Sequence, residues 1–181
     1  MRIIPAVVVS VLLLAFPAPS SGQTNLDIHG SGGPTLYDRG SSVSVGVGFT
    51  PTSWLSVVVD VERTHQPSRL STEHGVTSAF RGGTLTSVVG GIRASLFGPD
   101  RIGPYALAGL AVGVSRPNVN DLWPRRVAHQ VQGPFVGGGF QVPVGNRISL
   151  FADGRVMLMA GRQADVLLGV STIRAGMTWR F

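Results

Sequence analysis

Apolar and polar residues alternate along most of this chain, and no stretch after residue 22 shows the 3.6-residue period of an amphipathic helix. The clearest segment is 42–49, where valine or phenylalanine fills the odd positions and serine or glycine the even ones. A period of two sends successive side chains to opposite faces of a β-strand. Bounded by turn residues, such segments predict eight strands, at about 25–33, 42–49, 55–62, 83–97, 104–115, 133–143, 148–157 and 167–181.

The connections between the predicted strands alternate between short and long. The short ones hold turn-forming pairs such as Gly145-Asn146, and they are 50–53, 98–103 and 144–147. The long, polar ones are 34–41, 64–82 and 116–132, with 158–166 of intermediate length. Short turns at one end and longer loops at the other are typical of outer-membrane barrels, with the short turns in the periplasm. The pattern therefore predicts an all-β fold, an eight-stranded antiparallel transmembrane β-barrel.

Charged residues within the predicted strands avoid the apolar face. In 148–157, for example, Ile148 and Leu150 hold even positions, whereas Asp153 and Arg155 hold odd ones. An arginine that faces lipid at mid-bilayer costs about 2–4 kcal/mol, so the apolar face should meet lipid and the charged face the lumen. Arg63 has the opposite parity, and we expect it to reach lipid headgroups from the end of its strand.

The inward-facing charges are expected to form one network. It consists of four acidic and four basic residues: Asp27, Asp60, Glu62, Arg93, Asp153, Arg155, Arg174 and Arg180. An isolated buried ion is costly to desolvate, so these groups should be paired, with Glu62 and Arg174 among the partners. An eight-stranded barrel has room for little more than its own side chains. We therefore expect a plugged lumen rather than an open pore.

The composition supports a surface that does not face water throughout. Charged residues make up 13% of the chain, whereas about 25% is usual in soluble domains. The chain has no cysteine, which excludes disulfides, thiolate chemistry and lipid attachment through cysteine. The alternative is a soluble periplasmic carrier of the lipocalin type, in which the apolar face would point inward and the polar face outward.

The N-terminal segment predicts export. Arg2 gives a positive start, residues 3–16 are mostly apolar, and residues 17–22 are small or helix-breaking. This is the three-part plan of a secretory signal peptide, and the apolar run is shorter than the roughly 20 residues that a membrane-spanning helix needs. We expect residues 1–22 to be the signal peptide, cleaved before Gln23 or else after Ala18, and residues 23–181 to be the barrel domain.

The C-terminal segment 173–181 alternates apolar residues and ends in an aromatic one, which resembles the last strand of outer-membrane proteins. Segments 104–113 and 151–155 also resemble strands of the OmpA-like eight-stranded outer-membrane β-barrel superfamily. The resemblance implies export through the Sec pathway to a Gram-negative outer membrane. It also implies Met177, Trp179 and Phe181 as the signal for the barrel-assembly machinery. The chain stops at the barrel, so the peptidoglycan-binding role of full-length OmpA is not expected here.

Arginine is in excess in the long links. Candidate anion-binding residues at the surface are Arg69, Arg81, Arg116, Arg125 and Arg126. Guanidinium groups bind phosphate through two parallel hydrogen bonds, so outward-facing loops could hold lipopolysaccharide or an acidic surface polymer. A solvated loop surface near the headgroups explains the same residues without a ligand.

Catalytic chemistry has weaker support. His65 and His74 lie in the link 64–82 with Ser68, Ser71 and Glu73, so a Ser–His–acid set can be drawn there. Such triads are defined by three-dimensional geometry rather than by closeness in sequence. We expect no enzyme, no cofactor and no metal site, and an outer-membrane lipid-modifying hydrolase is the alternative.

The expected function is that of an integral outer-membrane protein with a structural or surface-binding role. Its expected partners are outer-membrane lipid and lipopolysaccharide, with the barrel-assembly machinery during biogenesis. Nucleic acid is not expected among them, because the aromatic residues lie near strand ends rather than beside the arginines. The chain is expected to act as a monomer.

Overall fold

The computed structural model describes most of the chain beyond the expected signal peptide. The described residues are 26–36, 39–73, 76–80, 82–98, 101–118, 128–161 and 167–181. Residues 1–22, the expected signal peptide, lie outside them, as do His74, Arg81, Arg125 and Arg126. Within the described part, no helix is long and apolar enough to cross a membrane.

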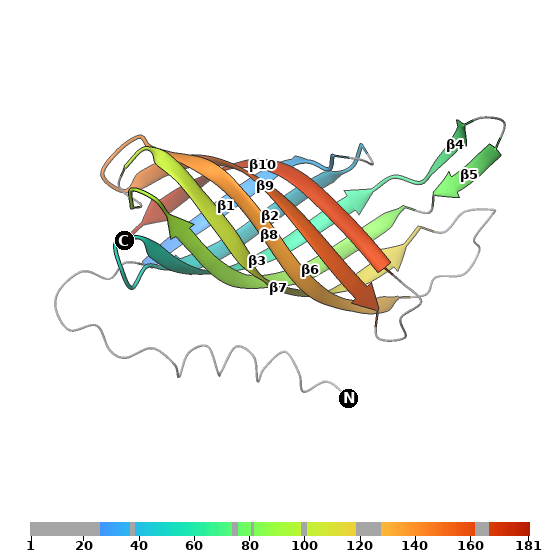
Figure 1. Cartoon of the computed structure of the whole chain (residues 1–181), viewed down its shortest axis with the longest axis horizontal. Helices are drawn as coiled ribbons and strands as arrows, with labels where there is room; N and C mark the ends of the chain where they lie inside the picture. Colours follow the sequence, from blue (N-terminus) through green and yellow to red (C-terminus); the bar gives the residue numbers. More distant parts are fainter. Residues whose placement is uncertain are drawn as a thin grey trace.

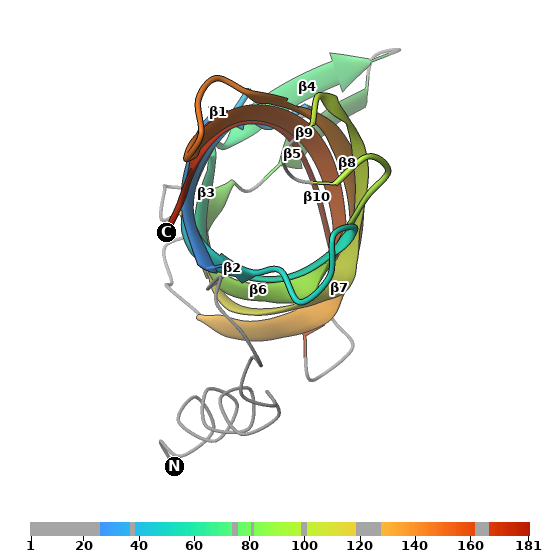
Figure 2. The same ribbon diagram turned by 90° about the vertical axis from the view of Figure 1, so that its left-hand side faces the viewer.

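Eight antiparallel strands form a closed barrel, which confirms the predicted fold (Figures 1 and 2). In chain order they are β1 (Leu26–Pro34), β2 (Ser41–Phe49), β3 (Leu55–Gln66), β6 (Gly83–Ser95), β7 (Gly103–Pro117), β8 (His129–Pro143), β9 (Ile148–Gly161) and β10 (Leu167–Arg180). Neighbours in the chain are neighbours in the barrel, and β1 pairs with β10 to close it, from Asp27 opposite Arg180 to Gly32 opposite Ala175. Closure leaves no unpaired strand edge in the barrel wall.

The expectation of a loop at 64–82 is wrong. Strand β3 continues to Gln66, and β4 (Arg69–Glu73) pairs with β5 (Val76–Phe80) in a separate two-stranded hairpin. Figure 1 shows this hairpin projecting from one end of the barrel, opposite the end where the C-terminus lies. Strand-favouring threonine, valine and phenylalanine are present in it, but serine, arginine and glutamate between them hide the alternation.

Three other strands are longer at the hairpin end than the sequence predicts. Strand β8 begins at His129 instead of 133, β9 runs to Gly161 instead of 157, and β7 runs to Pro117 instead of 115. The added residues pair with their neighbours, as Val131 does with Gly113 and Gly161. An apolar pattern marks only the part of a strand that meets lipid, so backbone pairing that continues beyond it has no hydropathy signal.

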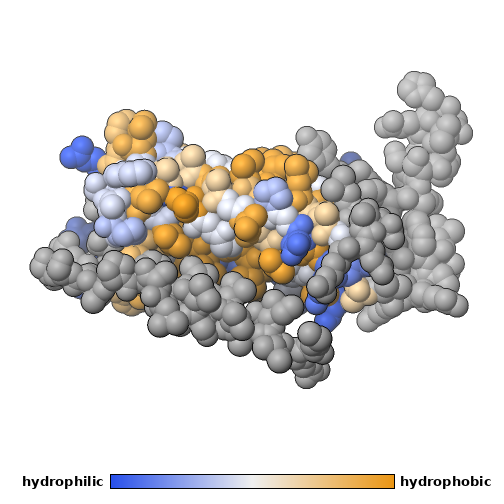
Figure 3. Space-filling view, turned by 60° about the horizontal axis from the view of Figure 1, so that its bottom comes forward, coloured by the Kyte–Doolittle hydropathy of each residue, from blue (hydrophilic) through white to orange (hydrophobic). Residues whose placement is uncertain are grey.

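The wall of the barrel is apolar outside and polar inside. On β2, Val43, Val45 and Val47 are about half exposed, while Ser42 and Ser44 are buried. Figure 3 shows an apolar surface over the middle of the barrel, with strongly hydrophilic residues towards its ends. This is the arrangement expected for a membrane barrel and the opposite of the one that a soluble carrier requires.

Two aromatic side chains pack against glycines inside the barrel. Phe135 of β8 is 2% exposed and lies beside Gly109 and Gly91, which face each other on β7 and β6. A Cβ atom added to Gly109 would lie 2.7 Å from the Phe135 ring. Phe151 stands in the same relation to Gly176, where an added Cβ would lie 2.6 Å from its ring. The glycines therefore provide the space in which these rings fill the lumen.

Candidate functional site

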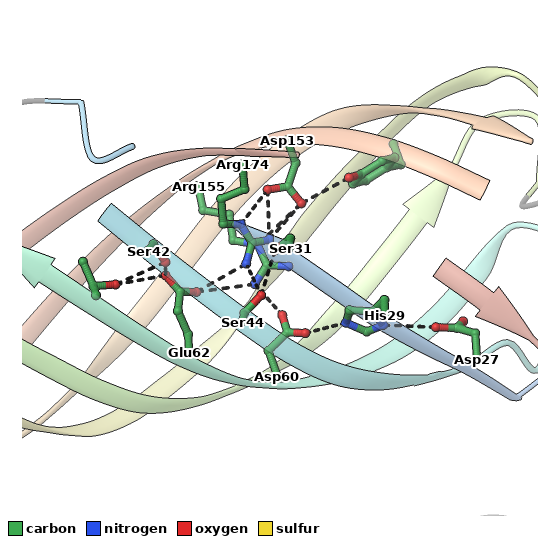
Figure 4. A network of polar contacts seen from close by, with 12 residues as sticks. Asp27, His29, Ser31, Ser42, Ser44, Asp60, Glu62, Asp153, Arg155 and Arg174 are labelled. Atoms are coloured by element: carbon green, nitrogen blue, oxygen red, sulfur yellow. Dashed lines mark hydrogen bonds and ion pairs between the residues drawn. The ribbon is translucent and has the colours of Figure 1, made fainter. Parts of the chain in front are cut away.

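Arg174 lies at the centre of a buried polar network inside the barrel (Figure 4). Its Nε and Nη2 donate to the two carboxylate oxygens of Asp153, each at 2.9 Å, in the two-pronged geometry that makes such pairs strong. Its Nη1 donates to Ser44 Oγ at 3.1 Å and to Glu62 Oε2 at 3.4 Å. Glu62 and Arg174, expected from the sequence to pair, thus meet although their strands are not neighbours in the barrel.

Arg155 is the second cation of the network. Its Nη1 donates to Asp60 Oδ2 at 2.6 Å and lies 4.0 Å from Glu62 Oε2. Its Nε lies 3.8 Å from Asp153 Oδ2, so one arginine of β9 contacts three carboxylates. The guanidinium carbon also lies 5.6 Å from the centre of the Phe135 ring, within the range of a cation–π contact. These contacts hold β9 to β3 across the lumen.

His29 extends the network along β1 and was not among the residues expected in it. Its Nδ1 lies 3.1 Å from Asp27 Oδ1, and its Nε2 contacts Asp60 Oδ1 (Figure 4). An ionised carboxylate only accepts hydrogen bonds, so two such contacts call for N–H groups on both sides of the ring, as in an imidazolium. The signal was present in the sequence, because His29 has the same strand parity as Asp27.

Neutral donors complete the contacts of the buried acids. Ser42 Oγ and Thr64 Oγ1 donate to Glu62 Oε1, at 2.8 and 3.2 Å. Tyr105 OH donates to Asp153 Oδ2 at 3.1 Å. Because hydroxyl groups supply hydrogen bonds without adding charge, the carboxylates are solvated by the protein where no cation reaches them.

Two of the eight expected network residues, Arg93 and Arg180, have other contacts. Arg93 contacts the side-chain oxygen of Gln141 and stacks on the Tyr105 ring, with its guanidinium carbon 4.6 Å from the ring centre. Gln141 in turn donates to the backbone oxygen of Gly98 at 2.9 Å. Arg180 donates to Ser149 Oγ at 3.0 Å. The other six, Asp27, Asp60, Glu62, Asp153, Arg155 and Arg174, are joined by the contacts described above.

A small cavity lies beside the network. Its volume is about 10 Å³, which is close to the minimum that one water molecule needs. It is lined by His29, Val58, Arg93, Tyr105, Leu107, Phe151, Asp153 and Arg155. Among the described residues, no group of three or more histidine or acidic side chains is arranged to hold a metal ion.

The remaining candidate residues lie on the outside of the barrel or beyond the described part. Met177, Trp179 and Phe181 are exposed on the outer wall at the C-terminal end. Arg116 is exposed near the end of β7 at the hairpin side, and the backbone of Arg69 begins β4. Arg63 is exposed as well, and it does not lie at a strand end as expected, because β3 continues for three more residues to Gln66.

No family model matches the chain, and no curated protein matches its sequence. Solved structures do match. Neisserial surface protein A (NspA) is similar at 15% identity with a TM-score of 0.68, over 89% of this chain and 100% of that one. The N-terminal β-barrel domain of Pseudomonas aeruginosa OprF is similar at 16% identity with a TM-score of 0.61, over 89% and 100%.

A third similar structure is Ail, the attachment invasion locus protein of Yersinia pestis, in complex with the heparin analogue sucrose octasulfate. It matches at 15% identity with a TM-score of 0.52, over 90% of this chain and 100% of that one. At such identities the likeness concerns the fold. The chain has the fold of the small outer-membrane barrels, as its resemblance to the OmpA-like superfamily implies.

Proposed function

We propose that the protein is an integral outer-membrane protein with a closed lumen and a structural or surface-binding role, and that it is not an enzyme. One observation carries the proposal: apolar side chains face outward along the strands, while a set of charged ones pair with each other inside, namely Asp60, Glu62, Asp153, Arg155 and Arg174. An apolar outer face is favourable in the hydrocarbon of a membrane and unfavourable in water. The paired interior needs no bound partner to neutralise it.

The closed lumen is supported by the contacts that cross it. Arg174 and Arg155 join β9 and β10 to β3, and His29 joins β1 to β3. The cavity of about 10 Å³ beside them is far too small for a substrate or a hydrated ion path. Eight strands enclose an interior just wide enough for side chains. The same crowding favours the absence of catalysis in the lumen, because its titratable groups already contact one another.

A conductance measurement tests the closed lumen. Purified protein is reconstituted in planar bilayers, after heat-modifiable migration on SDS gels has shown that the sample is folded. We expect no stable conductance steps, because the ion pairs and rings occupy the cross-section. Conductance steps of constant size that appear with the folded protein, and not with a boiled sample, would contradict a closed lumen.

Assembly by the barrel-assembly machinery belongs to the same proposal. Phe181 is 61% exposed, and its backbone nitrogen donates to Leu26 O at 3.1 Å, so its ring is available while its backbone is held. We expect Phe181→Ala to lower the amount of folded barrel in cell membranes but to leave refolding in detergent unchanged, both measured by heat-modifiable migration. Phe97→Ala, which removes another exposed aromatic ring, serves as the control. Equal losses for the two variants would contradict a specific terminal signal.

A surface-binding role is supported by the arginines of the long links and by the likeness to Ail, whose structure holds a sulfated heparin analogue. Of the candidate anion-binding residues, Arg116 is the one whose side chain the structure describes. It is exposed near the end of β7, on the side of the barrel where outer-membrane proteins face the cell exterior. The proposed ligands are therefore anionic groups at the outer surface, with lipopolysaccharide among them.

A further inference from the structure

Two arginines stand out because they face the lipid side of the wall. Among the strand residues whose side chains the structure describes, only Arg63 and Arg116 place a permanent charge outward. Both lie near the hairpin end of the barrel, on β3 and β7, with β6 between them. Lipid-facing arginine costs about 2–4 kcal/mol at mid-bilayer but only about 0–1 kcal/mol near the interface. Their position therefore indicates the depth of the headgroups.

The strand register brings these arginines to one patch. His65 of β3 lies opposite Thr84 of β6, which lies opposite Arg116 of β7. One row nearer the middle, Arg63 lies opposite Thr86. With strands about 4.8 Å apart and a rise of about 3.4 Å per residue, the Cα atoms of the two arginines are about 12 Å apart. We call these five residues, all on the outward parity, the rim patch.

Every side chain of the rim patch can donate a hydrogen bond. Two guanidinium groups, an imidazole and two hydroxyl groups can all donate hydrogen bonds, and no carboxylate belongs to the patch. Among the described side chains, no ion pair joins Arg63 or Arg116 to an acid. Long arginine side chains that start about 12 Å apart can converge on one anion between them, above the two threonines. A phosphate offers the oxygen acceptors that such a set requires.

An apolar row lies next to the rim patch, two residues nearer the middle of the barrel. Val61, Val88 and Val112 are paired in register across β3, β6 and β7, and each is about half exposed. Along the same three strands, hydrogen-bond donors thus lie directly beside apolar side chains. A soluble polyanion would contact only the donors, whereas a phosphorylated lipid would contact the donors with its phosphate and the valines with an acyl chain.

We propose that the rim patch binds the phosphate group of a phosphorylated glycolipid of the outer leaflet, with an acyl chain against the row Val61, Val88 and Val112. The inference rests on the proposed outer-membrane location and deepens it. It assigns the binding to residues of the barrel wall: Arg116, which the structure places within β7, and Arg63 of β3, which was not among the candidate anion-binding residues. Arg63 and Arg116 hold the phosphate oxygens, and His65, Thr84 and Thr86 donate further hydrogen bonds.

Native mass spectrometry of the folded protein in detergent tests the rim patch, with lipid A and its dephosphorylated form as probes. We expect lipid A to bind and the dephosphorylated lipid to bind more weakly. Arg63→Gln and Arg116→Gln should each weaken the binding of lipid A by about tenfold, which is the size expected for the loss of one charge-assisted hydrogen bond. Thr86→Val, which keeps the charge, should weaken it by less.

The matched control is the double variant Arg101→Gln and Arg147→Gln. It removes two exposed arginines in the short links β6–β7 and β8–β9, at the opposite end of the barrel. It should bind lipid A as the unchanged protein does, and heat-modifiable migration verifies the fold of every variant. Equal loss in the control and in Arg63→Gln with Arg116→Gln would overturn the proposal in favour of general charge attraction. Equal binding of dephosphorylated lipid would overturn the role of phosphate.

Two further arms separate the lipid from other sources and from the proposed function. Inorganic phosphate and sucrose octasulfate should not displace lipid A at equal concentration, because neither uses the valine row; efficient displacement would overturn a lipid site. Extraction of cell membranes then tests the location. Release of the protein without detergent would contradict the proposed function itself. A membrane-inserted barrel that does not bind lipid A would contradict only the proposal for the rim patch.

Discussion

An Arg174→Met variant is expected to unfold with a free energy about 3–5 kcal/mol lower than that of the unchanged protein. Arg174 is 1% exposed and contacts both Asp153 and Glu62. Replacing a whole buried ion pair by apolar residues is often harmless, but removing one partner leaves a buried charge without compensation. Methionine keeps the volume and removes only the charge and the hydrogen bonds. The expected loss is therefore that of the uncompensated carboxylates.

Urea unfolding in detergent micelles, followed by heat-modifiable migration, measures this loss. The control is Arg147→Met, which makes the same substitution at an exposed position in the short link between β8 and β9. Surface substitutions of this kind usually alter stability by less than about 0.5 kcal/mol. A change of less than about 1 kcal/mol for Arg174→Met would mean that the interior is well hydrated and that the network does not hold the barrel together.

A double variant separates charge from packing. Asp153→Asn, added to Arg174→Met, removes the carboxylate that loses most of its partners. We expect the double variant to be more stable than Arg174→Met alone, because residues in direct contact couple. Tyr105 can still donate to the new amide oxygen, as it does to Asp153 now. A double variant that is less stable than either single one would indicate that shape, and not charge balance, governs this part of the lumen.

The sequence predicts the distribution of charge between the two faces because strand geometry links parity to side. Asp60, Glu62, Asp153, Arg155 and Arg174 share the inward face of their strands, and each is buried as that parity requires. Partner choice has no such local signal. Arg155 meets Asp60 although β9 and β3 are separated by β10, β1 and β2 in the barrel wall, so their contact depends on barrel tilt and stagger.

The features missed from the sequence have a physical reason in common. His29 carries no formal charge in a residue count, so parity alone would have had to identify it. The hairpin of β4 and β5 and the extra length of β8 and β9 lie where no apolar face is needed. Backbone hydrogen bonds stabilise those segments whatever the side chains are, and the hydropathy pattern is silent there. The lipid-facing part of the fold is therefore more predictable than its ends.

A second stability prediction concerns two glycines on neighbouring strands, Gly109 and Gly90, which we expect to respond with opposite sign when each is replaced by alanine. Gly109 faces the lumen, and a Cβ atom there would lie 2.2 Å from Gly90 O and 2.5 Å from Gly91 Cα. Those are backbone atoms of β6 that cannot move without disturbing the ladder. Overpacking of a filled interior typically costs about 1–3 kcal/mol. We expect Gly109→Ala to lower the free energy of unfolding by that amount.

Gly90 provides the matched control in the neighbouring strand. It has the outward parity, and no atom lies within 4 Å of an added Cβ. Alanine at such a position restricts the unfolded chain without a clash, so Gly90→Ala should raise the free energy of unfolding by about 0.4–1 kcal/mol. Urea unfolding in micelles measures both variants. The opposite signs follow from side-chain direction: Gly109 of β7 faces the filled lumen, whereas Gly90 of β6 faces the open outer wall. If both substitutions stabilised the barrel, β6 and β7 would have to lie further apart at Gly109 than the structure shows. The close packing of Phe135 against Gly91 and Gly109 would then be wrong.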